Sequence, residues 1–150
     1  GNSMKHLRYL KYVLRHKYFV FIGGVKLNVS LWQLLIHDWT KFLPIEWRGY
    51  VERMELSKNS TWQSADDTDL YRIAWRHHWS SNPHHWQHWV FDGVAREMPE
   101  KYVREMVADW YGAGHAQGKP NIKQWWETTQ DRRILHPATH QRVVELVSLL

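Results

Sequence analysis

The dipeptide His37-Asp38, followed by Lys41, places an imidazole, a carboxylate and an ammonium group within five residues, HDWTK. Leucines precede Asp38 at the spacing of one helix face, so the pattern predicts a carboxylate that continues a buried apolar stripe. Burial of an unpaired carboxylate is costly, and a cation, a hydrogen-bond network or a metal ion usually offsets that cost. Asp38 is therefore the first candidate site residue.

Three further segments carry ligand-type side chains at apolar positions of expected helices. His77 and His78 end an apolar face. Asp109 follows Glu105 by one helical turn, and His16 lies in the apolar arc of the first expected helix. The sequence thus predicts inward-pointing imidazole and carboxylate groups on at least four helices.

The composition limits the chemistry of any such site. The chain has 11 histidines and no cysteine, so a metal has to be held by His, Asp, Glu and water, without a thiolate. The net charge of +5 favours an anionic partner. The charge alone does not choose between a phosphorylated small molecule and nucleic acid as that partner.

Length and hydropathy predict one intracellular domain. Residues 1–3 precede Met4 and are interpreted as the remnant of an expression tag, which leaves residues 4–150 as a single domain. We find no apolar run of about 18 residues and no cleavable signal segment. We therefore expect a cytoplasmic protein with no membrane partner.

Helical periodicity continues through almost the whole chain, without strand alternation or internal repeats. The expected helices span residues 4–22, 29–40, 44–57, 66–79, 84–90, 99–112, 121–133 and 137–150, with a polar loop at 58–65 and a flexible connector at 112–120. Gly23 and Gly24 are expected to end the first helix. Asn82 and Pro83 are expected to begin the short helix at 84–90. The predicted fold class is all-α, a compact orthogonal helical bundle.

The order of His16, His37-Asp38 and Asp109 resembles the H…HD…D ligand set of the HD-domain superfamily, and Lys41 matches its frequent HDxxK form. The blocks RHHWSSNPHHWQHW and EMPEKYVREMVADW resemble those of a small family of phage and bacterial HD-like proteins. The resemblance implies an HD-domain-like orthogonal bundle with one or two divalent metals. It also implies a bacterial or phage-infected host cell as the location.

The resemblance gives roles to individual residues. The expected metal ligands are His16, His37, Asp38 and Asp109 for a first ion, with His78 and His84 as candidates for a second. The expected catalytic residues are Lys41, His77 and His85, with Glu105 behind a ligand and Trp79 and Trp86 stacking on the substrate. Neighbours on a helix point about 100° apart, so one member of each histidine pair is expected to face elsewhere.

These expectations lead to a metal-dependent phosphohydrolase that acts on a phosphorylated small molecule by attack of metal-activated water on phosphorus. A nucleotide or cyclic nucleotide is the expected substrate, and nucleic acid is the less favoured partner. The candidate ions are Mn, Zn, Fe, Co and Ni. Two alternatives stay open. One is an HD-type di-iron oxygenase, which requires six protein ligands. The other is a non-enzymatic, Trp-rich basic binding protein in which any metal is structural.

Overall fold

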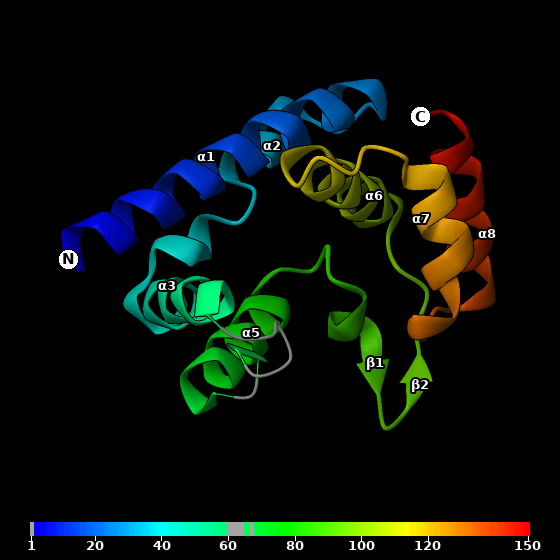
Figure 1. Ribbon diagram of the computed structural model, residues 1–150. Helices are drawn as coiled ribbons and strands as arrows, with labels where there is room; N and C mark the ends of the chain where they lie inside the picture. The colour runs from blue at the N-terminus through cyan, green and yellow to red at the C-terminus, as the bar shows by residue number, and fades with distance from the viewer. Residues whose placement is uncertain (1, 60–64, 67) are drawn as a thin grey trace. The chain divides into compact units, whose positions relative to one another are not determined.

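The computed structural model describes residues 2–59, 65–66 and 68–150 (Figure 1). Their α-helices are α1 (Asn2–Lys26), α2 (Leu31–Ile36), α3 (Pro44–Asn59), α5 (Asp69–Ser81), α6 (Glu100–Ala116), α7 (Ile122–Thr129) and α8 (Pro137–Ser148). Short 3-10 helices lie at η1 (Trp39–Phe42), η2 (Trp86–Trp89) and η3 (Gln130–Arg132). The all-α prediction is confirmed. Within the described helices, no stretch is both long and apolar enough to span a membrane.

The chain forms two compact units, each built from two stretches of sequence. The first unit contains residues 2–14 and the described residues of 38–82, and the second contains residues 15–37 and 83–150. The chain therefore passes between the units three times, after Leu14, after His37 and after Asn82. The expectation of one domain over residues 4–150 stays a prediction.

The first unit is organised by the packing of α3 on α5. Gly49 allows the close approach, because a Cβ atom there would lie 2.6 Å from both Ala74 Cβ and the Leu70 carbonyl oxygen. The amino-terminal part of α1 adds Tyr9 and Val13 to the core of this unit. Pro44 begins α3 as expected, since a proline at a first-turn position loses no helical hydrogen bond.

The second unit is built around α6, which packs on α7 and α8 and on the carboxy-terminal part of α1. Its core includes Val20 and Leu27 of α1, Met106 of α6 and Leu146 of α8. Figure 1 shows α7 and α8 side by side at the carboxy-terminal end. This core supports the histidines and carboxylates described below.

The first helix does not stop at Gly23-Gly24, as the sequence suggested, but continues to Lys26. Both glycines lie where neighbouring side chains come very close. A Cβ atom at Gly23 would be 2.6 Å from the ring of Tyr111, and one at Gly24 would be 2.3 Å from Leu34. The glycines therefore allow close packing rather than ending the helix.

The second helix is shorter than the expected span of 29–40. It ends at Ile36, and Asp38 follows in the left-handed region with φ of 58° before η1 begins. The prediction that Asp38 continues a buried stripe of leucines is also wrong, because Leu31 and Leu35 are 66% and 64% exposed. Asp38 is nevertheless buried, because the turn after α2 directs it inward.

Three other expectations fail in the region between α3 and α7. Instead of a helix at 84–90, the chain forms η2 and an antiparallel hairpin of β1 (Val90–Phe91) and β2 (Val94–Ala95), joined by Asp92-Gly93 with positive φ at both. Asn82 is the C-cap of α5 rather than the start of a helix. The expected connector at 112–120 is helical as far as Ala116. Gly1 and residues 60–64 of the expected loop lie outside the described residues.

Candidate metal centre

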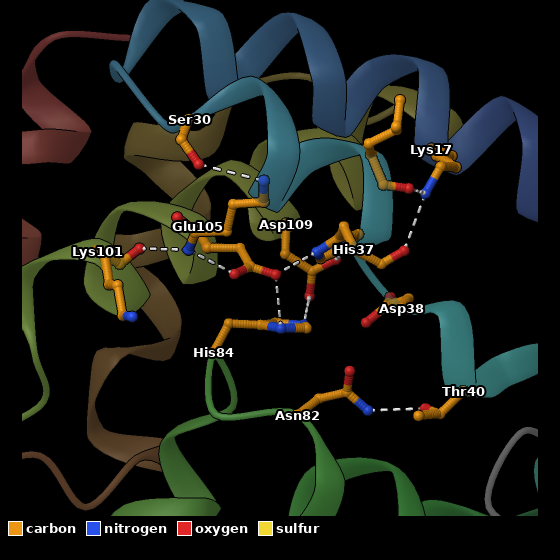
Figure 2. Close-up of polar contacts among 12 residues, drawn as sticks. Lys17, Ser30, His37, Asp38, Thr40, Asn82, His84, Lys101, Glu105 and Asp109 are labelled. Atoms are coloured by element: carbon orange, nitrogen blue, oxygen red, sulfur yellow. Dashed lines mark hydrogen bonds and ion pairs between the residues drawn. The ribbon is translucent and has the colours of Figure 1, made fainter.

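Glu105 and Asp109 lie one turn apart on α6, so both carboxylates point to the same side of the helix. Three imidazoles of the second unit meet them: His16 from α1, His37 from the end of α2, and His84 from the segment before η2. Figure 2 shows the side chains of His37, His84, Glu105 and Asp109 pointing toward one another.

The Glu105 carboxylate is buried and accepts hydrogen bonds on both oxygens. Its Oε2 lies 2.7 Å from His37 Nδ1 and 2.9 Å from His84 Nδ1, and its Oε1 lies 2.6 Å from Gln33 Nε2. Burial alone would raise the pKa of Glu105, but the hydrogen bonds from His37 and His84 outweigh it and hold the pKa at about 2. Glu105 is therefore an anion that orients both rings.

The Asp109 carboxylate faces the other ring nitrogen, Nε2, of His37 and His84, and it also faces Nε2 of His16. Its Oδ1 lies 2.8 Å from His16 Nε2 and 3.2 Å from His37 Nε2, and its Oδ2 lies 3.9 Å from His84 Nε2. Three imidazoles thus present the same atom, Nε2, toward one carboxylate. The Asp109 side chain is 14% exposed, against 6% for Glu105, so Asp109 is the more accessible of the two carboxylates.

Two overlapping groups in the second unit can hold a metal ion. In the group of His16, His37 and Asp109, and in the group of His37, His84 and Glu105, one ligand atom per residue lies within 4.8 Å of the others. Nitrogen and carboxylate oxygen donors without sulfur suit ions such as Mn, Fe and Zn. The first group is the better ligand set, because Glu105 lies behind His37 as carboxylates usually do behind metal-binding histidines.

The end of α2 is fixed by hydrogen bonds that position His37. Lys17 Nζ donates to the carbonyl oxygens of Leu35 and His37, at 2.8 and 3.0 Å. Ser30 caps α2 by accepting a hydrogen bond from the Gln33 amide, and the Gln33 side chain also donates to Lys101 O (Figure 2). These contacts tie α2 to α1 and α6, the helices that supply His16, Glu105 and Asp109.

The first unit contains a network around Asp38. Asp38 Oδ2 lies 2.9 Å from Lys41 Nζ, and Asp38 Oδ1 lies 3.3 Å from His78 Nε2. His78 Nδ1 lies 2.6 Å from Glu46 Oε1, and the other Glu46 oxygen bonds to His77 Nδ1. One carboxylate therefore holds the adjacent pair His77 and His78, although His77 retains 30% side-chain exposure.

Charge pairing shifts the pKa values of this network. Burial would raise the pKa of Glu46, but hydrogen bonds from His78, Thr40 and His77 hold it below its usual value. Burial would likewise lower the pKa of His78, but the Asp38 and Glu46 carboxylates raise it. Asn82 donates to Thr40 Oγ1 and to His78 O, both at 2.8 Å, which fixes the end of α5 (Figure 2).

The expected site residues are thus distributed over both units. Those that meet in the second unit are His16, His37, His84, Glu105 and Asp109, with the His85 ring 4.3 Å from that of His84. Those that meet in the first unit are Asp38, Lys41, His77 and His78. Trp86 packs against the core of the second unit, and Trp79 is half-buried on α5.

Sequence reasoning missed Glu46, Gln33 and Lys17. Glu46 lies in the first turn of α3, where an acidic residue is favoured by the helix dipole and is usually exposed, so no sequence signal marks it as fully buried. Gln33 is two residues from Leu35 on a short helix, and its contact with Glu105 depends on tertiary packing. A polar residue within a largely apolar hexapeptide, LWQLLI, was the one available signal for it.

Comparison with known proteins identifies the family of the chain but no function for it. A family model matches residues 5–149. The chain belongs to DUF5662, a family of unknown function. No curated protein and no solved structure matches it. The match spans every residue of the candidate metal centre.

Proposed function

We propose that the protein is a metal-dependent phosphohydrolase that acts on a phosphorylated small molecule, with a nucleotide or cyclic nucleotide as the expected substrate. The observation that carries this proposal is the convergence of three Nε2 atoms, from His16, His37 and His84, on the Asp109 carboxylate. Buried imidazoles and carboxylates without a thiolate are typical of hydrolytic metal centres.

His16, His37 and Asp109 are the proposed metal ligands within the second unit. The resemblance to the H…HD…D pattern adds Asp38, the residue that follows His37 in the chain. Glu105 binds His37 and His84 through Nδ1 and so keeps Nε2 of both rings as the ligating atom. Glu105 is therefore a positioning residue in this proposal.

A bound divalent ion supplies two effects, polarisation of a phosphoryl oxygen and a lower pKa for its water ligand. The chain supplies the remaining functions. His84, whose Nε2 is the most distant of the three from Asp109, is suited to hold a proton or a second ion. The overall charge of +5 favours an anionic substrate.

The test combines metal analysis with turnover. We expect purified protein to carry one or two transition-metal ions per chain and to hydrolyse a phosphodiester such as bis-p-nitrophenyl phosphate or a panel of nucleotides. Asp109→Asn should lose both metal and turnover while it keeps its helicity. Asp131→Asn is the matched control, since Asp131 is an exposed acid in the same unit and should keep both.

Three results would overturn the proposal. A protein that binds no Mn, Zn, Fe, Co or Ni after incubation has no catalytic metal centre. A metal-loaded protein that hydrolyses no phosphate ester is not a phosphohydrolase, and two irons per chain with oxygen uptake would favour the oxygenase. Equal loss of metal in Asp131→Asn would show that the effect is not specific to Asp109.

A further inference from the structure

The short helix α2 exposes an unusual number of large apolar side chains. Leu31, Trp32 and Leu35 are 66%, 69% and 64% exposed, and Leu34 is the buried residue that anchors the helix. Single exposed apolar residues are ordinary, but a concentration of them on one element marks an interaction surface.

The carboxy-terminal part of α1 adds apolar side chains next to α2. Tyr18, Phe21 and Val25 are 63%, 42% and 54% exposed, and their i, i+3, i+7 spacing puts them on one face of α1. The Lys17 bond to Leu35 O holds α1 and α2 together. We call this surface the apolar face, defined by Tyr18, Phe21, Val25, Leu31, Trp32 and Leu35; all of it belongs to the second unit.

The charge around the apolar face has one sign. Residues 15–37, the stretch of the second unit that carries the apolar face, contain Arg15, Lys17 and Lys26 and no aspartate or glutamate. Asp38 is the first acidic residue of the chain. Three cations and no acidic residue therefore share the segment that carries the apolar face.

We propose that the apolar face binds the surface of an anionic lipid bilayer. Lys and Arg next to exposed Trp, Tyr, Phe and Leu are typical of segments that lie in the bilayer interface, where the rings and aliphatic groups enter the headgroup region and the cations contact anionic lipids. Two copies of this chain would bring like charges together, which disfavours self-association through the same face.

This inference is independent of the proposed hydrolase activity. The sequence predicted no membrane partner because no segment can span a bilayer, and peripheral binding needs no such segment. What the sequence did not show is that Leu31 and Leu35, which were expected to face the core, are exposed.

The test is co-sedimentation of the full chain with vesicles. We expect binding to an equal mixture of phosphatidylglycerol and phosphatidylcholine, loss of binding at high salt, and no binding to pure phosphatidylcholine. The double variant Trp32→Gln, Leu35→Gln should bind about tenfold more weakly, since it removes two inserting side chains. Val94→Gln, Leu149→Gln is the matched control, because both residues are 67% exposed in the same unit.

Circular dichroism would first establish that both double variants keep the helicity of the wild type. Failure of the wild-type protein to sediment with anionic vesicles overturns the proposal, as does equal weakening in the control. A concentration-dependent dimer that Trp32→Gln, Leu35→Gln abolishes, without vesicle binding, would assign the face to a second copy. Capture by an acidic peptide in place of vesicles would assign it to a protein partner.

Discussion

A single carboxylate, Glu105, controls the orientation of two histidines. Nδ1 of His37 and Nδ1 of His84 both contact Oε2 of Glu105, and Oε1 accepts a hydrogen bond from the Gln33 side chain. With three hydrogen bonds, this anion stays charged although it is buried. We therefore expect the affinity of the centre for a metal ion to depend on Glu105, a residue that need not touch the metal.

Glu105→Gln tests that dependence. An amide of the same shape lacks the charge and presents one acceptor oxygen in place of two, so it no longer orients both rings. We expect the affinity for Mn²⁺ or Zn²⁺ to fall by about 10- to 100-fold, measured by titration calorimetry on protein of unchanged helicity. The exposed Glu127→Gln in the same unit should bind as the wild type does. Unaltered affinity in Glu105→Gln would contradict the orienting role.

Asp38 has a backbone requirement in addition to its carboxylate. Its φ of 58° lies in the left-handed region, which glycine adopts without strain and alanine does not. Asp38→Ala and Asp38→Gly remove the same contacts with Lys41 and His78. Asp38→Ala should therefore be about 1 kcal/mol less stable than Asp38→Gly, as measured by urea denaturation. Equal stability of the two variants would contradict this.

The sequence predicted which histidines and carboxylates are buried better than it predicted the backbone structure that buries them. His16 was expected inside from its neighbours in α1 and is buried. Asp38 was expected inside as part of a helix stripe, but a left-handed turn places it there. Glu46 was not predicted, because hydrogen bonds from two distant histidines make its burial possible and no local pattern encodes them.

At the scale of elements, Pro44 and Pro137 were correct signals of a helix start, whereas Pro83 and the glycines were misleading. Pro44 and Pro137 begin α3 and α8 as expected, since their effect is local. Gly23, Gly24 and Gly112 act through tertiary packing, which a single sequence does not reveal. The Asp92-Gly93 dipeptide is typical of a hairpin turn, whereas the apparent helical periodicity over residues 84–90 predicted a helix that does not form.

The contact of α1 with α6 predicts a ranking of two glycine substitutions. A Cβ atom at Gly112 would lie 2.7 Å from the backbone nitrogen of Val20, whereas one at Gly23 meets the side chain of Tyr111, which can move. Gly112→Ala should lose about 1–3 kcal/mol in the free energy of unfolding, and Gly23→Ala should lose less. Denaturant titration of both variants measures this. The reverse order would show that α1 and α6 separate more easily than their packing indicates.

Arg133 joins α6 to α7 by contacts with aromatic rings. Its guanidinium carbon lies 4.7 Å from the ring centroid of Trp110 and 4.4 Å from that of Trp125, and Nη1 donates to Thr129 O at 2.7 Å. Arg133→Gln removes the cation and should cost about 1 kcal/mol, seen as a lower Tm. Arg132→Gln makes the same charge change at an exposed neighbour and should be neutral. An equal decrease in Tm in the two variants would show that Arg133 acts through the overall charge rather than through its contacts with the rings.

At the scale of the whole molecule, the division into two units makes the position of a bound metal measurable. A ligand that binds the folded state stabilises it, by about 2.7 kcal/mol at a free concentration one hundred times its Kd. The stabilisation is strongest where the ligands are attached. With His16, His37 and Asp109 as ligands, the affected elements belong to the second unit, and α6 is foremost among them.

Removal and return of the metal therefore has a regional signature. We expect chelation to lower Tm and added Mn²⁺ or Zn²⁺ to restore it. Hydrogen exchange followed by mass spectrometry should show the largest gain in protection over Glu100–Ala116, since the metal would bind Asp109 and Glu105 would hold the ligand His37. The Asp109→Asn protein is the control and should show no gain. A gain confined to Asp69–Ser81, the helix of His77 and His78, would instead place the metal in the first unit. Glu46 and Asp38 would then be the carboxylates to examine, because both contact His78.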